Sequence, residues 1–436
     1  MDAAFACEPG FGIGAGEFTE SMGSIDIKKS DGTKVLTTSL SLGIGSAVYR
    51  DPKDPEGVFW AVTDRGPNYD CDSMELDPAG MFCDAANKVF GKPTFSPTIV
   101  KVTLSRGAGP TCPLNVTVSD KLAIADKDGM GITGLPISPA YNTEAAVSID
   151  QAIIPDNDNG MDTEGLVRLA DGSFWVSEEY GPSLAHISAA GKVLERVTPA
   201  GVKPAGAIPY APNYPVTDGL PGILTKRKQN RGFESLALSP DGKFLYTALQ
   251  SPMRNPDKTA GDKSLVIRIH KIALTAGGAF EKMDGEWLYL LDNETTFVLA
   301  DNIAVKRTDL KLSEMVALAE DDLLIQERTD LVTKIYRATL TASTKLDAAK
   351  WDDVATTPTL EQYASTDAAF TGVKAISKNL VFDGVVRSRA MSVPALPNKI
   401  EGIFVMGNFL VFVNDNDFSG TQKTVVTLLP RPAASK

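Results

Sequence analysis

Histidine and cysteine are scarce in this chain of 436 residues, which contains two His and four Cys. No two of the cysteines form a Cys-x-x-Cys pair. Zinc sites in proteins are built mainly from clustered Cys and His ligands. The composition therefore argues against a zinc finger or a zinc hydrolase.

Long apolar runs and several catalytic motifs are also missing. No run of 18 apolar residues occurs, so we expect no membrane span. The sequence has no Gly-x-Ser-x-Gly, no His-Glu-x-x-His and no phosphate-cradling Gly-rich loop. These absences exclude the serine-hydrolase elbow, the zinc-protease helix and the P-loop as templates.

Positive charge is in deficit, with 43 Lys and Arg against 55 Asp and Glu, for a net charge of −12. Such a surface repels nucleic acid and anionic membranes. We therefore expect a small-molecule partner, no nucleic acid, and a monomer. A bound divalent metal would offset part of the charge.

The four cysteines all lie in the first 112 residues, at Cys7, Cys71, Cys83 and Cys112. An even, clustered count predicts two disulfides and an oxidising compartment, with buried reduced thiols as the alternative. Of three connectivities we favour Cys71 with Cys83, which leaves Cys7 with Cys112, and residues 71–112 form a disulfide-candidate loop region. No signal peptide is visible, and Met1 before Asp-Ala-Ala is typical of a start added to a mature chain. We expect a periplasmic or secreted protein.

The stretch Asp156–Pro182 predicts a β-hairpin with acidic ends. Two short apolar runs, Leu166–Leu169 and Phe174–Ser177, flank the turn Asp171-Gly172, and Asp-Gly between apolar runs is a strong hairpin signal. Carboxylates stand at the start of the first strand and at the end of the second. In an antiparallel pair these positions share one end, so the carboxylates gather at one rim.

The same hairpin recurs three more times. Each copy begins with a glutamate and has a two-residue turn that contains Asp or Gly. The opening glutamates are Glu164, Glu234, Glu314 and Glu401. Each gap between them exceeds the roughly 40 to 50 residues of a usual propeller blade. With 37 Gly and 27 Pro and few helical patterns, the repeat predicts an all-β fold. We expect one β-propeller domain over residues 1–436, with six or seven blades and loop insertions, its first and last segments sharing a blade. A β-sandwich is the alternative.

Repeat glutamates on inner strands would converge at one mouth of the central channel. Convergent carboxylates do not all stay ionised without a partner, and Ca²⁺ is the simplest partner because it takes six to eight oxygens. The predicted metal ligands are Glu164, Glu234, Glu314, Glu401, Asp162 and Glu179. The alternative is structural: a glutamate before a strand accepts hydrogen bonds from backbone amides of the next blade.

Basic residues beside the repeats suit a phosphate group, because the Arg fork matches phosphate oxygens. We predict substrate binding by Arg65, Arg231, Arg328 and Lys226. Metal-assisted hydrolysis of a phosphate ester would then use Glu164, Glu234, Asp64 and Arg65 as catalytic residues. The alternative is that each Arg pairs with a neighbouring repeat carboxylate.

Four motifs resemble those of the bacterial phytase-like family, the "esterase-like activity of phytase" proteins: Asp64–Asn68, Asp162–Leu166, Ser177–Pro182 and Asn230–Leu236. The resemblance extends over about residues 40 to 420. It implies a propeller-like, exported protein linked by name to phosphate-ester hydrolysis. At the level of fold alone, the chain is also similar to the β-propeller phytases, which use calcium ions to hold phosphate.

The leading hypothesis is an exported, calcium-dependent phosphoric ester hydrolase that acts on a phosphate ester or another small anionic substrate. A calcium-dependent lactonase or esterase propeller is the first alternative. A metal- or ligand-binding propeller without turnover is the second.

Overall fold

The computed structural model describes residues 11–29, 31–71, 83, 87–107, 112–137, 144–201, 212–299, 304–387 and 395–431. In these ranges the chain consists of β-strands with short helices in the connections. The all-β fold class expected from the sequence is confirmed. None of the helices described is long and apolar enough to cross a membrane.

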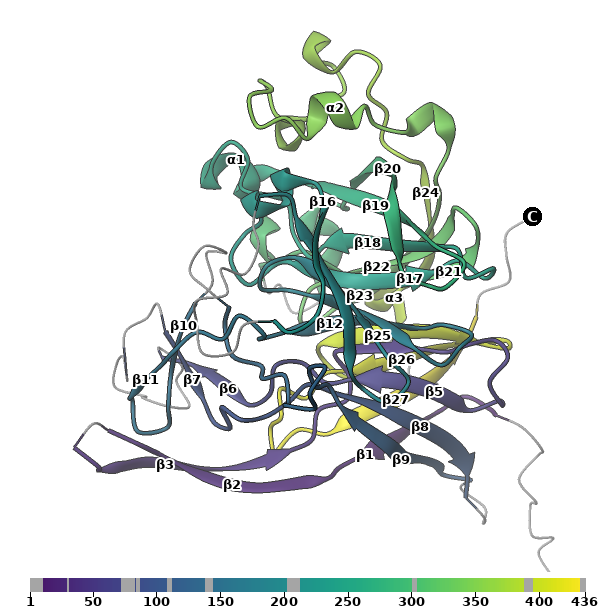
Figure 1. The fold of residues 1–436 in the computed structure, drawn as a ribbon. Coiled ribbons are helices and arrows are strands. Elements are labelled where there is room, and N and C mark those ends of the chain that lie inside the picture. Colours follow the sequence, from purple (N-terminus) through teal and green to yellow (C-terminus); the bar gives the residue numbers. More distant parts are fainter. Residues whose placement is uncertain are drawn as a thin grey trace, which may run out of the picture.

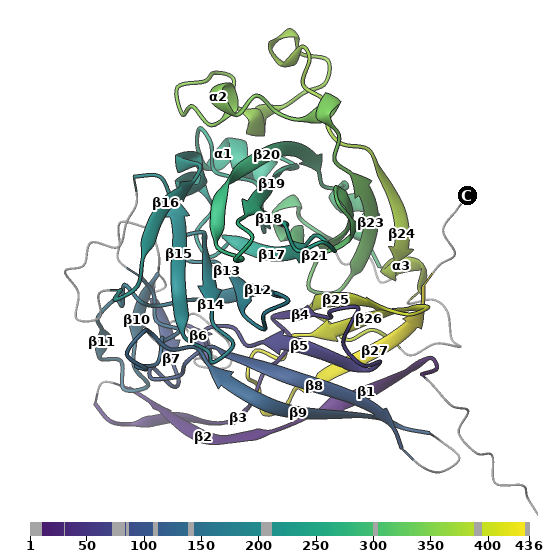
Figure 2. The same cartoon turned by 45° about the vertical axis from the view of Figure 1, so that its right-hand side comes forward.

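Five sheets stand around a central axis (Figures 1 and 2). From inside to outside, the first holds β4 (Ala47–Tyr49), β5 (Val58–Val62), β8 (Thr98–Arg106) and β9 (Leu114–Ala123). The second holds β12 (Thr163–Arg168), β13 (Phe174–Glu178), β14 (Ser183–Ile187), β15 (Val193–Pro199) and β16 (Val216–Leu220). The third holds β17 (Phe233–Leu238), β18 (Phe244–Leu249), β19 (Val266–Leu274) and β20 (Phe280–Leu290).

The last two sheets complete the circle. One holds β21 (Lys311–Ala319), β22 (Asp322–Arg328), β23 (Thr333–Thr339) and β24 (Lys378–Asp383). The other holds β25 (Ile400–Met406), β26 (Phe409–Asn414), β27 (Thr424–Pro430) and, from the opposite end of the chain, β1 (Gly14–Phe18). Because β1 pairs with β27, the expectation that the first and last segments share a blade is confirmed.

The inner strands close a ring. Each of β4, β12, β17, β21 and β25 contacts the next in this order, and β25 contacts β4. Radial sheets around a ring of inner strands define a β-propeller. Aromatic side chains fill the spaces between blades, as where Phe59 of the first sheet meets Phe404 of the last with ring centroids 4.7 Å apart.

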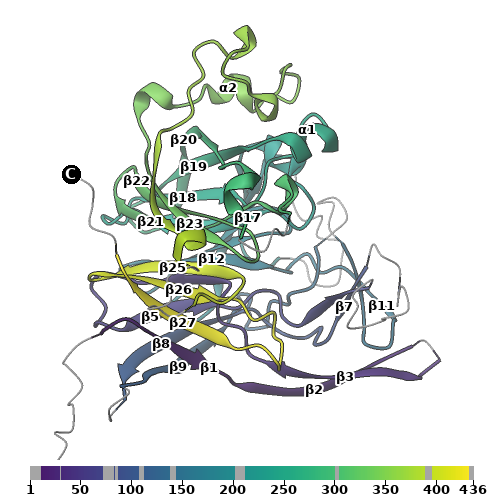
Figure 3. The same ribbon diagram turned by 180° about the vertical axis from the view of Figure 1, so that it is seen from behind.

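The number of blades differs from the expectation. The described residues form five propeller sheets rather than six or seven, and β12 contacts β4 directly. The remaining length lies outside the ring, in a long hairpin and a separate small sheet, seen from behind in Figure 3. The hairpin is β2 (Ser21–Lys28) with β3 (Lys34–Ser41), and the sheet is β6 (Asn68–Asp70), β7 (Asn87–Phe90), β10 (Ala145–Val147) and β11 (Ile153–Ile154).

An insertion between β23 and β24 covers the outer edge of the third sheet, at the top of Figure 1. Its short helices are η5 (Ala342–Thr344), α2 (Ala348–Trp351), η6 (Leu360–Gln362) and η7 (Ala368–Phe370). The sequence here is polar, yet Trp351 and Leu360 are buried against Val266 and Leu288. The other helices of the described residues are η2 (Gly222–Lys226), α1 (Lys258–Lys263), η3 (Glu294–Phe297), η4 (Arg307–Asp309) and α3 (Gly384–Arg387).

The expected Cys71–Cys83 disulfide is present. Cys112 is disulfide-bonded as well. Cys7 lies outside the described residues, so its predicted pairing stays a prediction.

Candidate functional site

A β-bulge places each repeat glutamate at the start of an inner strand. The pairing of β12, β17, β21 and β25 with their second strands shifts register at this point. On the inner strands the pairing skips Glu164, Glu234, Ser313 with Glu314, and Glu401, and in the blade of β21 it also skips Gln326 of the second strand. A bulge re-aims the side chain of the extra residue, and bulges are common beside active sites. The fifth inner strand, β4, has Ser46 just before its first pair.

Three of the four repeat glutamates line a polar pocket of about 440 Å³ at one mouth of the channel. We call this the polar pocket. The hairpin strand β3 and the small sheet contribute residues to its wall, so the parts outside the ring border this mouth. Its charged lining residues are Asp64, Arg65, Asp70, Lys88, Glu164, Glu179, Arg231, Glu234, Lys311, Asp330, Lys399, Glu401, Asp415 and Asp417.

Asp64, Asp162 and Glu164 form the tightest carboxylate group, with one oxygen of each within 4.8 Å of the others. Arg65 contacts both oxygens of Asp162, through its amide at 3.2 Å and its Nη1 at 2.9 Å. Ser46 donates to Oε2 of Glu164 at 2.7 Å. The amide of Gly66 donates to Oδ1 of Asp64 at 2.8 Å. These hard oxygens suit a cation such as Ca²⁺.

Burial makes these carboxyl groups hard to ionise. Loss of solvent raises the pKa of Asp64 to about 6 and that of Asp162 to about 7, against the lowering effect of Arg65. Burial, followed by the charge of Glu234, raises the pKa of Glu164 well above its usual value. A cation bound among them would favour the ionised forms, so the electrostatics of the group fit a metal.

Glu179 and Glu234 extend the acidic wall. Burial, followed by the charge of Asp162, raises the pKa of Glu179 to about 8. Burial, followed by the charge of Glu401, raises the pKa of Glu234 to about 7. Oε2 of Glu234 is buried and has no hydrogen-bond partner among the described residues. This oxygen is available to a ligand.

Glu314 does not line the polar pocket. Its carboxyl is buried deeper in the channel, where it accepts hydrogen bonds from the amides of Met315 at 3.0 Å and Val48 at 3.4 Å. Burial raises its pKa well above the usual value, and the amide of Leu236 is a further partner. These contacts join three inner strands, which is the structural alternative raised by the sequence. The structure therefore separates Glu314 from the predicted metal ligands.

Arg65 is buried within the acidic wall. Its Nη1 lies 2.6 Å from Glu144 Oε1 and donates to Asn230 Oδ1 at 2.8 Å. Its guanidinium also stands over the Tyr180 ring, 5.6 Å from the centroid. These contacts, together with Asp162, show that Arg65 holds the carboxylates in place as well as lining the pocket.

The three other predicted cations lie in different settings. Arg231 lines the pocket and, in the described part of the chain, makes one side-chain hydrogen bond, to Ser251 at 3.4 Å. Arg328 is fully buried, paired with Glu401 and, at 3.2 Å, with Glu234, and does not line the pocket. Lys226 is exposed and is also not part of the lining.

Two lysines that the sequence reasoning missed face the same pocket. Lys311 pairs with Asp330 at 2.9 Å, and Lys399 contacts Asp415 at 3.4 Å. Each stands two or three residues before a repeat glutamate, as Arg231 does before Glu234. The repeat itself therefore contained the signal for a cation at this position.

The acidic residues before and after the first hairpin have separate roles. Asp156 does not line the pocket. Glu178 is buried and binds Arg196 at 3.0 Å, the amide of Tyr180 at 2.7 Å and Ser183 at 3.0 Å. Of the pair that ends this hairpin, only Glu179 faces the pocket.

Comparison with known proteins gives a family and distant fold relatives. The family model described as "Phytase-like: Esterase-like activity of phytase" matches residues 41–418. An "Uncharacterized secreted protein" of Arthroderma benhamiae is 30% identical over 240 residues, which cover 49% of this chain and 44% of that protein. The chain thus spans less than half the length of this relative.

Two solved structures align at low similarity. The PQQ-bound aldose sugar dehydrogenase of Streptomyces coelicolor aligns with a TM-score of 0.30 and 10% identity, over 95% of this chain and 93% of that one. The arabinanase Arb43A of Bacillus subtilis aligns with a TM-score of 0.31 and 12% identity, over 89% and 96%.

Proposed function

We propose a function from the premise that this chain belongs to the phytase-like family described by esterase-like activity of phytase. We infer that it is an exported, calcium-dependent phosphoric ester hydrolase. The observation that carries the proposal is one pocket of about 440 Å³ with a buried carboxylate group on one side and Arg231 and Lys311 among its lining cations. Export is supported by the Cys71–Cys83 disulfide and by a relative that is named a secreted protein.

Calcium would be held by Asp64, Asp162 and Glu164, with Glu179 and Glu234 as further carboxylates of the same wall. When bound, a divalent cation supplies Lewis-acid polarisation of a phosphoryl oxygen and readies a water. Arg65 orients Asp162 through two contacts and so holds its carboxylate in place beside those of Asp64 and Glu164.

Arg231 is the residue best placed to bind the phosphoryl group. Its guanidinium lines the pocket with few protein partners, whereas Arg328 is enclosed by carboxylates. A planar guanidinium binds phosphate through two parallel hydrogen bonds. We assign Arg328 the separate role of keeping Glu234 and Glu401 apart and in place.

Phosphate release from phytate and from 4-nitrophenyl phosphate, with calcium and with a chelator, tests the proposal. We expect release that needs calcium, a KM at least tenfold higher in Arg231→Gln, and weaker calcium binding by calorimetry in Glu164→Gln. Lys226→Gln is the matched control, since Lys226 is exposed and outside the pocket, and it is expected to keep wild-type kinetics. No release from either ester with calcium bound, or hydrolysis of lactones and carboxylic esters instead, would overturn the assignment.

A further inference from the structure

A second cavity opens at the other mouth of the central channel, with a volume of about 490 Å³. It is lined by the far ends of the inner strands and by the turns that follow them. We call it the hairpin-side cavity, after these blade turns and not after the β2–β3 hairpin, which borders the polar pocket. No residue that lines it also lines the polar pocket. The carboxyl of Glu314 is buried at its inner end, bonded to the amides of Val48 and Met315, which both line the cavity. The channel thus holds two separate cavities.

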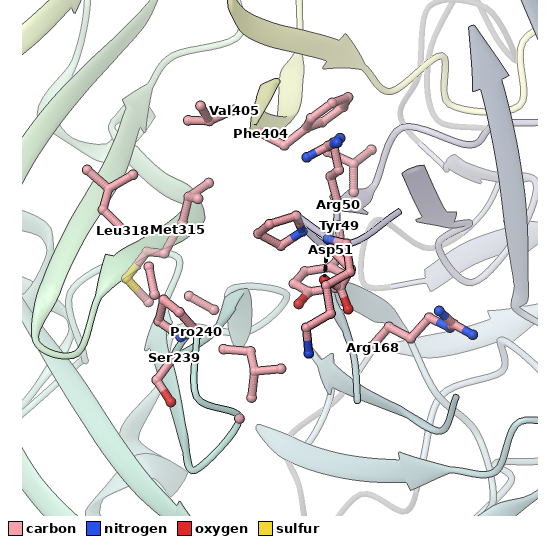
Figure 4. Close-up of a pocket in the computed structure, with 18 of the residues that line it drawn as sticks. Tyr49, Arg50, Asp51, Arg168, Ser239, Pro240, Met315, Leu318, Phe404 and Val405 are labelled. Atoms are coloured by element: carbon pink, nitrogen blue, oxygen red, sulfur yellow. Dashed lines mark hydrogen bonds between the residues drawn. The ribbon is translucent and has the colours of Figure 1, made fainter. Parts of the chain in front are cut away.

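One side of the hairpin-side cavity is apolar. Figure 4 shows Met315 and Leu318 from β21 on one wall and Phe404 and Val405 from β25 on the next. Phe404 is held by its ring contact with Phe59 at 4.7 Å. A volume within the roughly 300–1,000 Å³ of small-molecule pockets, with apolar walls, suits a compact hydrophobic body.

The opposite side is polar, and some of its charged side chains have fewer hydrogen-bond partners than others. In Figure 4 the guanidinium of Arg50 lies beside Phe404, at the edge of the apolar wall. Its Nη2 donates to the carbonyl of Asp54 at 3.2 Å, while its buried Nε has no acceptor among the described residues. Tyr49 stands next to it, and burial raises the pKa of its phenol, which therefore remains a donor.

The acidic residues of the rim already have donors. Asp51 accepts the amide of Lys53 at 2.9 Å, and Asp241 pairs with Lys243 at 2.8 Å. Arg168 points away from the cavity in Figure 4 and stacks over Trp60, 4.8 Å from the ring centroid. Lys53 also lines the cavity, but its side chain is exposed to solvent, so the buried cationic group that lacks an acceptor on this wall is the Nε of Arg50.

We propose that the hairpin-side cavity binds an amphipathic monocarboxylate, with its apolar body against Met315, Leu318 and Phe404 and its carboxylate on Arg50. With Asp51 and Asp241 also in the lining and Lys53 exposed to solvent, the cavity suits a single negative charge better than a phosphate dianion, because the two carboxylates would repel the second charge. The proposal is independent of the chemistry at the polar pocket.

Calorimetric titration with 4-phenylbutyrate tests the assignment, with 4-phenylbutan-1-ol as the neutral match and 4-phenylbutylamine as the cationic match. We expect saturable binding of the acid at one site, at least tenfold weaker binding of the alcohol, and no saturable binding of the amine. Arg50→Gln should weaken the acid at least tenfold and change the alcohol by less than twofold.

Two further variants keep the test decisive if Arg50→Gln is unstable. Leu318→Glu places a carboxylate on a half-buried wall position and should also weaken the acid at least tenfold. Lys226→Gln removes an exposed cation that lines neither cavity and should leave the affinity within twofold. Absence of saturable binding, equal affinity for acid and alcohol, or loss of binding in Arg231→Gln with retention in Arg50→Gln would overturn the proposal.

Discussion

Raising the pH from 6.5 to 8.5 should destabilise the calcium-free protein through its buried carboxyl groups. Burial raises the pKa of Glu179 to about 8 and that of Glu234 to about 7, whereas unfolded Glu ionises near 4.5. Over this range both glutamates are already ionised in the unfolded chain, whereas in the folded protein they still release protons as the pH rises. Each of them therefore lowers the free energy of unfolding until the pH passes its folded-state pKa. For Glu179 the loss between these pH values is about 2 kcal/mol, and for Glu234 about 1 kcal/mol.

Urea unfolding at both pH values, with chelator and with calcium, measures this effect. Calcium should remove most of the loss, because a cation stabilises the ionised carboxylates without requiring protons. Starting at pH 6.5 avoids most of the opposite effect of His270, whose pKa is lowered by burial to about 4 and which adds stability as pH rises to 6.5. Asp352 of the insertion has a pKa raised to about 7 and pairs with Arg268, so its share of the loss should persist with calcium.

Glu179→Gln is the matched variant. It removes the titrating carboxyl of Glu179 and keeps the shape of the side chain, so the chelator-treated variant should lose about 2 kcal/mol less than the wild type. Unchanged or rising stability at pH 8.5 in chelator, or an equal loss in Glu179→Gln, would refute the account of a carboxylate wall held neutral by burial.

The remaining predictions concern how the site is built. Arg328→Met leaves the buried Glu401 without its cation, so we expect a loss of about 3–5 kcal/mol in urea unfolding; a change under 1 kcal/mol would contradict the pairing. Gly232→Ala puts a Cβ 2.0 Å from the carbonyl oxygen of Glu179, so it should cost about 1–3 kcal/mol and weaken calcium binding by calorimetry; unchanged binding would show that Glu179 is not a ligand. Trp351→Ala, in the insertion, should cost about 3–5 kcal/mol yet keep calcium affinity within twofold, and a larger change in affinity would link the insertion to the site.

The repeated hairpin could be predicted from sequence because its signals are local. The turns after Glu164 and Glu234 fall on Gly172 and Gly242, which adopt φ of 89° and 76°. A positive φ costs glycine little, so the Asp-Gly pairs fix the hairpins on their own. The number of blades cannot be predicted from local signals, because it depends on contacts between strands that are distant in sequence. Here β12 contacts β4 directly, and the small sheet and the β2–β3 hairpin lie outside the ring.

The rim of carboxylates was also predictable, since three of the four opening glutamates and Glu179 share one end of their hairpins and line the polar pocket. The partners of each charge were not. Whether a guanidinium faces solvent or a carboxylate depends on the neighbouring blade, which is far away in sequence. Arg65 and Arg231 reach the polar pocket, but Arg328 is enclosed by Glu234 from the preceding blade and Glu401 from the following one.

Glu314 differs in role from the other three repeat glutamates, and the strand register explains why. Every register shift amounts to one residue, because in the blade of β21 the pairing skips Ser313 and Glu314 but also Gln326 of β22. Ser313 therefore stands where the other three blades have their glutamate, directly after the last pair before the shift, and Glu314 stands one place later. From this offset position the Glu314 carboxyl reaches the amides of Met315 and Val48, and Ser313 takes the outer position, where it donates to Glu234 at 3.1 Å and accepts from Arg328 at 2.6 Å. The buried Glu314 then separates the two cavities. The one-place offset of Glu314 along its strand thus gives the channel a polar pocket and a distinct hairpin-side cavity.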